Sequence, residues 1–300
     1  MRVKISQLPL PLDYEEKDII KAAAAKLECS EGLLSGLKII RRSMDARSRR
    51  EAPVFSIHVE IEISDSDDFL LPDDKDIEKI DVGKSSPEIM IPKLSVKTKG
   101  RPVVIGSGPA GLMAALALAE AGLSPLLIER GAPVKERTSQ VSLFWKNGEL
   151  NPEGSVLFGE GGAGLFSDGK LTTRSKDRLR VRRFLETLVK CGAPEDILID
   201  SEPHLGTDIL KKIVPAFRNL IEGAGGEVRF HSRLEGLRAE SGRLCGIIVN
   251  GQDIETKHCI LATGHSARDV YQMLDESGVM IEQKSFAVGL RLELPQERID

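Results

Sequence analysis

The 300-residue sequence predicts an α/β fold in which a small N-terminal unit precedes a larger region. Three observations support this prediction. Residues 1–82 alternate between strand-like and helix-like apolar patterns. A glycine-rich turn at residues 106–111 joins an apolar strand to a helix. Several short strand-like runs follow one another between residues 226 and 262. A chain of this length is expected to form about two domains.

Residues 1–82 are predicted to form a β-α-β-β unit. The first residues alternate as in a strand, and a capping box that begins at Asp13 marks the start of a helix with one apolar face. Two strands are expected next, at residues 37–40 and 54–63. Residues 83–100 contain two prolines and four lysines, and we predict that they form a linker.

A cluster of arginines separates the two later strands of this unit: Arg41, Arg42, Arg47, Arg49 and Arg50. Such a cluster could bind RNA phosphates. However, residues 60–81 hold ten acidic residues against two lysines, and the net charge of −4 leaves no overall basic character. A solvated loop is therefore the favoured interpretation, and nucleic acid binding stays open as the alternative.

Four cysteines are scattered along the chain without a C-x-x-C pair: Cys29, Cys191, Cys245 and Cys259. This spacing predicts neither a disulfide framework, nor a dithiol redox centre, nor a metal site. The apolar stretch at residues 112–119 is too short to cross a bilayer, which takes about 20 residues. Early prolines and acidic residues also interrupt any signal peptide. We expect a cytoplasmic protein with no membrane partner.

The glycine-rich turn predicts a site for a dinucleotide. Gly106 permits the tight turn, Gly108 lets the backbone approach a pyrophosphate, and Gly111 lets the helix lie close to the strand. Pro109 suits the first helical position, and the free N–H groups at the helix start favour a phosphate. Glu129 ends the next strand, roughly 20 residues later, where a carboxylate accepts hydrogen bonds from ribose hydroxyls. The same carboxylate disfavours NADP at this site.

The segment after this unit distinguishes between FAD and NAD. An NAD domain would continue as a regular alternation of strands and helices. Residues 226–262 instead predict four or five short strands with polar turns, followed by Ala262, Thr263 and Gly264. A β-meander inserted into such a Rossmann-like domain resembles the FAD domain of the glutathione-reductase-like flavoproteins. Four further segments resemble the uncharacterised bacterial FAD-dependent dehydrogenases: residues 129–137, 158–171, 203–208 and 262–268.

The resemblance implies that FAD binds non-covalently and that the flavin transfers hydride. Residues implied at the pyrophosphate are Gly106, Gly108, Pro109, Ala110 and Gly111. Those implied toward the adenosine are Glu129, Arg130 and Leu234, with Arg137 available to a phosphate. Those implied beside the ribityl chain, the flavin ring or another part of the cofactor are Gly161, Gly162, Ala163, Gly164, Ser167, Ala262, Thr263 and Gly264. The substrate is not implied.

Three side chains are weak candidates for chemistry. Lys170 could stabilise an anionic reduced flavin, or it could pair with Asp168 on the surface. His265 could carry a proton, or it could hydrogen-bond the backbone or a phosphate. Neither choice is settled by the sequence, so no catalytic residue is assigned.

An FAD-dependent oxidoreductase is the predicted function. A flavoprotein that acts on tRNA or another RNA, and a non-catalytic FAD-binding protein, stay open as alternatives. A second convincing dinucleotide turn is missing from the sequence, so NAD(P)H is expected only as a transient electron donor, and a small-molecule substrate or redox partner is expected.

The predicted FAD domain covers residues 101–268, and residues 269–300 are predicted to begin a substrate domain that is incomplete. FAD domains of the resembling type are discontinuous, and the chain returns to the cofactor after a second domain. We therefore expect a natural protein longer by about 200 residues, the size of an ordinary domain.

Overall fold

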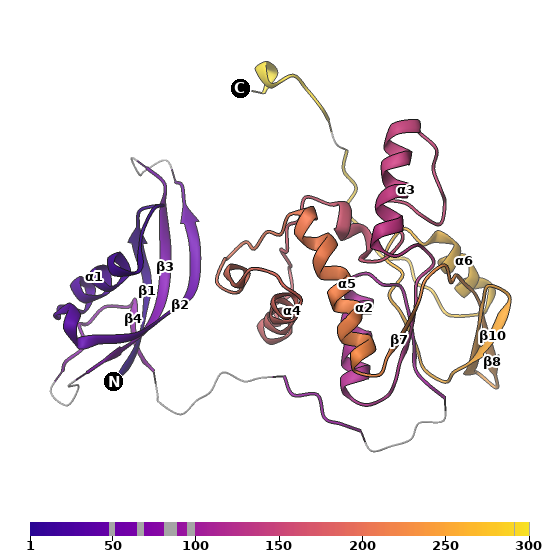
Figure 1. The fold of residues 1–300 in the computed structure, drawn as a ribbon, viewed down its shortest axis with the longest axis horizontal. Helices are drawn as coiled ribbons and strands as arrows, with labels where there is room; N and C mark the ends of the chain where they lie inside the picture. The colour runs from indigo at the N-terminus through magenta and orange to yellow at the C-terminus, as the bar shows by residue number, and fades with distance from the viewer. Residues whose placement is uncertain (48–51, 65–68, 81–88, 95–99, 291, 300) are drawn as a thin grey trace.

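The computed structural model describes residues 1–47, 52–64, 69–80, 89–94, 100–290 and 292–299. The described part contains a four-stranded antiparallel sheet, a four-stranded parallel sheet and a three-stranded antiparallel sheet. Figure 1 shows the N-terminal sheet on one side and the other two sheets in the larger region. This arrangement confirms the predicted fold class: a Rossmann-like α/β domain with an inserted meander, preceded by a small N-terminal domain.

The N-terminal unit is an antiparallel sheet with one covering helix. Its elements are β1 (Arg2–Leu10), α1 (Glu16–Leu27), η1 (Glu31–Leu33), β2 (Leu34–Asp45), β3 (Val54–Ile63) and β4 (Ile77–Ile80). The strand order is β2-β3-β1-β4, so β2 is an edge strand. Alternate residues of β1 and β3, among them Ile5 and Val59, are buried in a core that they share with Ile19 of α1. The capping box joins Glu15 to Asp18, two residues later than predicted.

The parallel sheet is the scaffold of the larger region. It is formed by β5 (Val103–Ile105), β6 (Leu126–Ile128), β7 (Glu227–Arg229) and β11 (Cys259–Leu261), in the order β11-β5-β6-β7. Every residue of β5 and β6 is buried, as expected for parallel strands that are covered on both faces. Hydrophobic residues of α2 (Pro109–Glu120), α4 (Arg178–Lys190) and α5 (Thr207–Gly223) form one core with Val104 and Leu127.

The meander covers the other face of this sheet. It consists of β8 (Leu234–Glu240), β9 (Arg243–Val249) and β10 (Gln252–Glu255), and Leu234, Ile247 and Val249 are buried against Val103 and Ile128. The predicted run of four or five short strands is therefore divided, because its first and last strands, β7 and β11, belong to the parallel sheet. The remaining elements are α3 (Val134–Asn147), η2 (Gly162–Phe166), η3 (Glu195–Leu198), α6 (Arg268–Glu276) and η4 (Gln296–Arg298).

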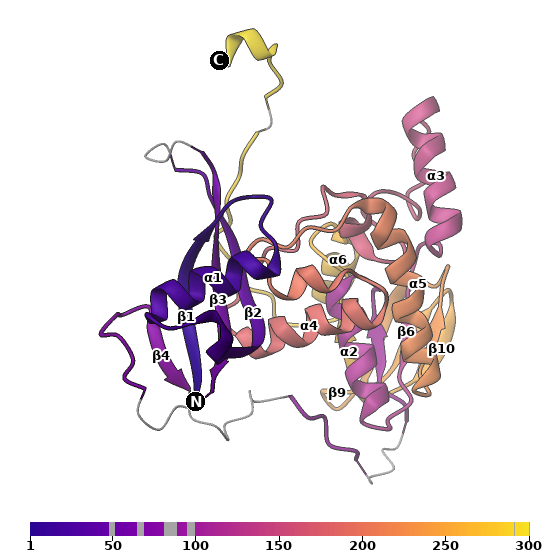
Figure 2. The same ribbon diagram turned by 60° about the vertical axis from the view of Figure 1, so that its left-hand side comes forward.

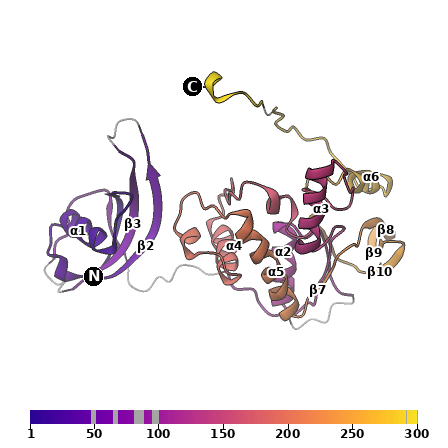
Figure 3. The ribbon, with the colours of Figure 1, turned by 45° about the horizontal axis from the view of Figure 1, so that its top comes forward.

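The N-terminal unit contacts the larger region through its edge strand. The Arg42 N–H donates to the Ile199 carbonyl at 2.7 Å, and the Ser201 N–H donates to the Arg42 carbonyl at 2.9 Å. The Arg42 side chain also bonds Asp200 at 2.7 Å and Asp196 at 3.0 Å. Figures 2 and 3 show α4 on the side of the larger region that faces β2, with the meander on the far side. A strand edge and a salt-bridged arginine thus join the two parts.

Several predicted features lie partly outside the described residues. Residues 83–88 and 95–99 of the predicted linker are not described, and residues 89–94 form neither helix nor strand. Arg49 and Arg50 also lie outside the described part. Among the described residues, no helix combines the length and apolar character that a membrane span requires. Within the same residues, no group of acidic, histidine and cysteine side chains is arranged to hold a metal ion.

Candidate functional site

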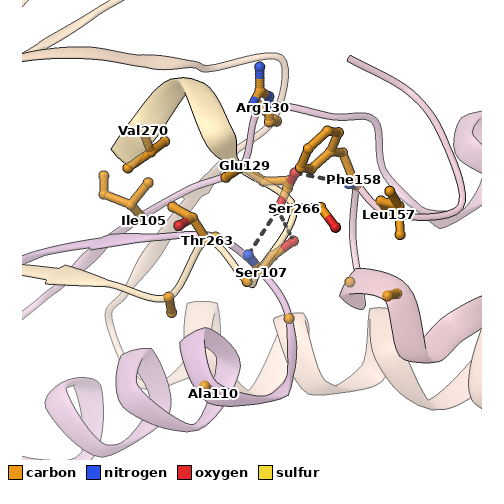
Figure 4. A pocket seen from close by; sticks show the side chains of 18 of the residues that line it. Ile105, Ser107, Ala110, Glu129, Arg130, Leu157, Phe158, Thr263, Ser266 and Val270 are labelled. Carbon is orange, nitrogen blue, oxygen red and sulfur yellow. Dashed lines mark hydrogen bonds between the residues drawn. The ribbon is translucent and has the colours of Figure 1, made fainter. Parts of the chain in front are cut away.

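A cavity of about 340 Å³ opens where β5, β6 and β11 end, and we call it the strand-end cavity. Its lining comes from residues 105–110, 129–130, 157–164, 232–234 and 262–270, where not every residue of each range contributes. Figure 4 shows this cavity from close by. Ligands of open α/β sheets bind at the carboxyl ends of the strands, which makes this cavity the first candidate for a functional site.

The glycine turn after β5 is packed too tightly for larger residues. Gly106 has a φ of +99°, and a Cβ at this position would collide with the carbonyl oxygen of Ala262. A Cβ on Gly111 would collide with the carbonyl oxygen of Gly106. Gly108 differs, since the nearest atom to a Cβ there would be the Gly162 Cα at 3.9 Å. Gly106 and Gly111 therefore serve the packing of the turn, and Gly108 keeps the cavity open.

The first turn of α2 faces the cavity without a side-chain cap. Gly108 is the N-cap residue, Pro109 is the first helical residue, and no described side chain bonds to this helix start. The N–H groups of a first helical turn have no acceptor within the helix. Together with the helix dipole they favour an anion. Pro109 and Ala110 are both exposed and line the cavity, so this helix start is accessible to a phosphate.

Glu129 lies at the end of β6 with only 5% of its surface exposed. One carboxylate oxygen accepts the Ser107 N–H at 2.9 Å and the Ser107 hydroxyl at 2.8 Å. The other accepts the N–H groups of Gly131 and Gly159, each at 2.9 Å. Dashed lines in Figure 4 join Ser107 to Glu129. A carboxylate offers about four lone-pair sites, and in Glu129 four protein donors occupy them.

A second glycine-rich segment, residues 159–164, forms the opposite wall. Gly159, Gly161 and Gly162 all have positive φ angles, of +113°, +87° and +62°. The Gly161 N–H donates to the Ser107 carbonyl at 3.0 Å, and a Cβ on Gly162 would lie 2.9 Å from the Gly108 Cα. The two glycine-rich segments therefore lie directly against each other, which leaves backbone as the surface that a ligand would meet.

Arg137 lies beneath this second segment and is completely buried. Its guanidinium donates to the carbonyls of Ser155, Gly159, Glu160 and Gly162, at 3.1, 3.2, 2.7 and 2.8 Å. Burial lowers the pKa of Arg137 to about 10, although the nearby negative charges of Glu129 and Glu160 act to raise it. The sequence led us to expect Arg137 to be available to a phosphate. In the structure it does not line the strand-end cavity, and its Nε and Nη1 groups hold the loop carbonyls instead.

Glu160 was missed by the sequence analysis, although an acidic residue inside a glycine-rich run is an available signal. It is 1% exposed, and its carboxylate accepts the Val134 N–H at 2.7 Å. The Arg218 guanidinium of α5 lies 3.5 Å from its other oxygen. Burial is the main cause that raises the pKa of Glu160, and the Val134 hydrogen bond and Arg218 oppose it. Glu160 thus connects the second glycine-rich segment to the start of α3 and to α5.

Arg130 and Phe158 form the rim of the cavity near the start of α6. The Arg130 guanidinium lies 4.5 Å from the centre of the Phe158 ring. It bonds Glu153 at 2.6 Å and Asp269 at 3.0 Å. Burial alone would lower the pKa of Arg130, but these two carboxylates raise it above its ordinary value. The charge of Arg130 is therefore largely compensated by protein groups.

Most of the predicted site residues lie together around the strand-end cavity. Those that line it are Gly106, Gly108, Pro109, Ala110, Glu129, Arg130, Gly162, Ala163, Gly164, Leu234, Ala262, Thr263 and Gly264. Gly111, Arg137, Gly161 and Ser167 do not line it. Lining residues that the sequence analysis missed include Ser107, Phe158 and Val270. Ser107 was the easiest to find, because it stands between two glycines of the turn.

Of the three candidate catalytic residues, one lines the strand-end cavity and two do not. His265 is exposed and lines the strand-end cavity. Lys170 and Asp168 do not line it, and they form an exposed ion pair at 3.0 Å, which is the surface pairing left open by the sequence. The Lys170 ammonium lowers the pKa of Asp168.

All four cysteines are free thiols. Burial raises the pKa of each, to about 11 for Cys191 and Cys259 and by a smaller amount for Cys29 and Cys245. A thiol acts as a nucleophile only after it loses its proton, so these thiols are poorly suited to redox exchange near neutral pH.

Comparison with known proteins gives two family matches. Residues 100–294 match the model described as pyridine nucleotide-disulphide oxidoreductase. Residues 2–62 match a domain of unknown function, DUF8436. An uncharacterized protein of Clostridium beijerinckii is 44% identical over 308 residues, and the alignment covers 100% of this chain and 56% of that protein. The chain therefore spans little more than half the length of this relative.

Several solved structures are similar at low identity. THI4 of Thermovibrio ammonificans is 19% identical, over 60% of this chain and 64% of that chain, with a TM-score of 0.41. L-Proline dehydrogenase from P. horikoshii is 16% identical, over 64% and 57% of the two chains, with a TM-score of 0.35. Thioredoxin reductase of Lactococcus lactis is 20% identical, over 55% and 36%, with a TM-score of 0.31.

Proposed function

Since this chain belongs to the pyridine nucleotide-disulphide oxidoreductase family, we propose that it binds FAD non-covalently and acts as a flavin-dependent oxidoreductase. The observation that carries this proposal is the strand-end cavity, which two glycine-rich segments border at the carboxyl ends of three parallel strands. A dinucleotide needs backbone that it can approach closely and a helix start that faces its phosphates. Both features are present around this cavity.

The residues of the cavity fit such a group. A Cβ on Gly108 would have the Gly162 Cα at 3.9 Å as its nearest neighbour, so the space directly in front of Gly108 is free for a ligand. In this proposal the start of α2 binds the pyrophosphate, and Glu129 and Arg130 lie toward the adenosine ribose. Leu234 flanks the adenine, and residues 162–164 and 262–264 contact the rest of the cofactor. Arg137 positions residues 159–162 from below.

The flavin supplies the hydride chemistry when it is bound, and the protein supplies position and electrostatics. His265 is the titratable side chain that we propose for proton movement at the cavity, because it lines the cavity and is exposed. NAD(P)H is proposed as a transient electron donor, and the substrate or redox partner is proposed to be a small molecule. We do not extend the disulphide chemistry of the family name to this chain, because its four thiols are scattered and have raised pKa values.

The RNA alternative gains no support from the described arginines. Arg42 bonds Asp200 and Asp196, Arg41 bonds the Ser201 hydroxyl at 2.8 Å, and Arg47 bonds Asp45 at 2.7 Å. Each of them has a protein partner within the described structure. A non-catalytic FAD-binding protein differs from our proposal only in whether the bound flavin turns over.

The decisive experiment compares two glycine substitutions. Gly108→Val places a side chain in the space in front of α2, where a Cβ would have the Gly162 Cα at 3.9 Å as its nearest neighbour. Gly32→Val is the control, because a Cβ at Gly32 has no atom within 4 Å and this glycine lies in the N-terminal unit. FAD affinity is measured by quenching of flavin fluorescence. We expect Gly108→Val to weaken binding by more than about tenfold and Gly32→Val to leave it unchanged. Equal affinities in the three proteins, or no flavin binding by the natural sequence, would contradict the proposal.

A further inference from the structure

We propose that a second, apolar cavity beside the strand-end cavity is the substrate site and that it takes a neutral, largely apolar small molecule. The name substrate site rests on the proposed function of the neighbouring cavity. The chemical class of the ligand rests on the lining alone. We call this second site the apolar cavity.

The apolar cavity has a volume of about 890 Å³ and lies between α2, α4 and α5. Its walls are helix faces, with Met113 from α2, Leu188 from α4 and Phe217 from α5 among them. Ile89 and Ile91 complete it on the side of the segment that precedes β5. Sites for small molecules commonly have volumes of about 300 to 1,000 Å³ with mainly apolar walls and a few polar groups. The apolar cavity agrees with this description in size and in composition.

The two cavities meet at shared residues. Pro109, Ala110 and Gly164 line both of them. Gly161 and Ser167, which were predicted beside the flavin and do not line the strand-end cavity, line the apolar cavity instead. A molecule in the apolar cavity would therefore lie next to a ligand that reaches the end of the strand-end cavity. This adjacency is what a substrate of a bound cofactor requires.

The charged groups of the apolar cavity favour a neutral ligand. Its lining contains Lys170, Arg180 and Arg183. Lys170 is paired with Asp168, Arg180 with Asp177 and Arg183 with Glu120. An ionised substrate would lose water without gaining an unpaired counter-charge among these residues, which is unfavourable. The hydroxyl groups of Thr172 and Thr173, which also line the cavity, can instead donate to a carbonyl or hydroxyl group.

The first experiment measures binding of the neutral apolar dye Nile red and of the anionic dye 8-anilinonaphthalene-1-sulfonate to the full chain. Ala117→Trp fills the apolar cavity from α2, and Ser142→Trp places the same side chain on an exposed position of α3 that lines neither cavity. We expect Ala117→Trp to lower Nile red affinity by at least about tenfold, and Ser142→Trp to change it by less than about twofold. If the two variants change Nile red affinity equally, the dye does not bind in the apolar cavity and the proposed site is wrong.

A second variant tests the ligand class and does not depend on core packing. Thr172 is exposed and lines the apolar cavity, so Thr172→Arg adds a positive charge to its lining. The natural sequence should bind Nile red more tightly than the anionic dye, and Thr172→Arg should shift this preference toward the anionic dye. A preference for the anionic dye in the natural sequence, or an unchanged preference in Thr172→Arg, overturns the proposed class.

Separate readouts distinguish this inference from the proposed function. FAD binding is measured on the same proteins, and Ala117→Trp should retain it because Ala117 does not line the strand-end cavity. If FAD binds and Ala117→Trp leaves Nile red unaffected, the inference alone fails. If FAD does not bind while the dye results are as expected, the proposed function fails and the ligand class stands. Bound FAD should also quench bound Nile red, and an absence of quenching overturns the role as substrate site.

Discussion

Ser107 donates both its backbone N–H and its hydroxyl to Glu129, so a single residue of the glycine turn makes two of the four hydrogen bonds that this carboxylate accepts. Three of the four donors, from Ser107, Gly131 and Gly159, are backbone N–H groups, which are fixed by the fold. The hydroxyl of Ser107 can rotate. It is therefore the donor that a ribose hydroxyl would replace if a nucleotide binds Glu129.

This relationship predicts the effect of Ser107→Ala on ribose recognition. Removing the competing hydroxyl frees one acceptor site of Glu129, and a hydrogen bond to a charged group is stronger than a neutral one. We expect the preference for ADP over 2′-deoxy-ADP to rise by about three- to tenfold in Ser107→Ala. Calorimetric titration measures the two affinities. Ser232→Ala is the control, because Ser232 lines the same cavity but bonds the Phe230 carbonyl. An unchanged preference would show that the hydroxyl does not compete.

Arg137→Lys is predicted to loosen the second glycine-rich segment. A lysine ammonium offers a single nitrogen, whereas the guanidinium reaches the four carbonyls through two nitrogens, Nε and Nη1. Carbonyls that lose a partner while they stay buried should lower the free energy of unfolding by about 2 to 4 kcal/mol. Urea unfolding measures the loss, with Lys135→Ala on the exposed face of the same helix as the control. FAD affinity should fall together with the stability. An unchanged FAD affinity in Arg137→Lys would contradict the role of Arg137 in positioning residues 159–162.

Glu160 gives a prediction about pH. Its pKa is raised above the ordinary value of 4.5, chiefly by burial, so ionisation is harder in the folded than in the unfolded chain. Its contribution to stability is present below its ordinary pKa and is lost as the pH rises through the raised pKa. Glu160→Gln escapes this loss and can still accept the Val134 N–H.

The melting temperature of Glu160→Gln, relative to the natural sequence, should therefore increase from about pH 4 to about pH 8. Scanning calorimetry at several pH values provides the measurement. If the attraction between Glu160 and Arg218 outweighs burial, the relative melting temperature will decrease with pH instead.

Arg42→Ala is predicted to weaken the contact between the N-terminal unit and the larger region. The two backbone hydrogen bonds between Arg42 and residues 199–201 remain, but the bonds to Asp200 and Asp196 are lost. A partly exposed pair contributes up to about 1 kcal/mol, so the Ser201 N–H should exchange with deuterium up to roughly fivefold faster. Arg47→Ala is the matched control, since Arg47 pairs with Asp45, the last residue of β2, within the N-terminal unit. If the Ser201 N–H exchanges at the same rate in both variants, the two backbone hydrogen bonds alone hold the contact.

The sequence alone predicted those elements whose structure is determined by a local pattern of residues. The period of the apolar residues located α1 and β3, and the spacing of Gly106, Gly108 and Glu129 located the turn and the acidic strand end. The assignment of β7 and β11 to the parallel sheet could not be predicted, because both stand beside the meander in sequence and their partners are distant.

Long-range packing also explains what the site predictions missed. Nothing in the sequence of α3 indicates that Arg137 is turned inward to the loop carbonyls, since the arginine lies on a helix rich in polar residues. The apolar cavity likewise depends on how α2, α4 and α5 meet, and these helices lie far apart along the chain. The Lys170–Asp168 pair was one of two possibilities, and only the fold distinguishes them.

Glu129 joins three separate parts of the chain: the turn after β5, the end of β6 and the start of the second glycine-rich segment. Both walls of the strand-end cavity are therefore ordered by folding itself. Immobilising a loop during association costs conformational entropy, and here that cost falls on folding instead. Association should then proceed in a single kinetic step whose rate rises linearly with ligand concentration, without a slower phase for loop closure.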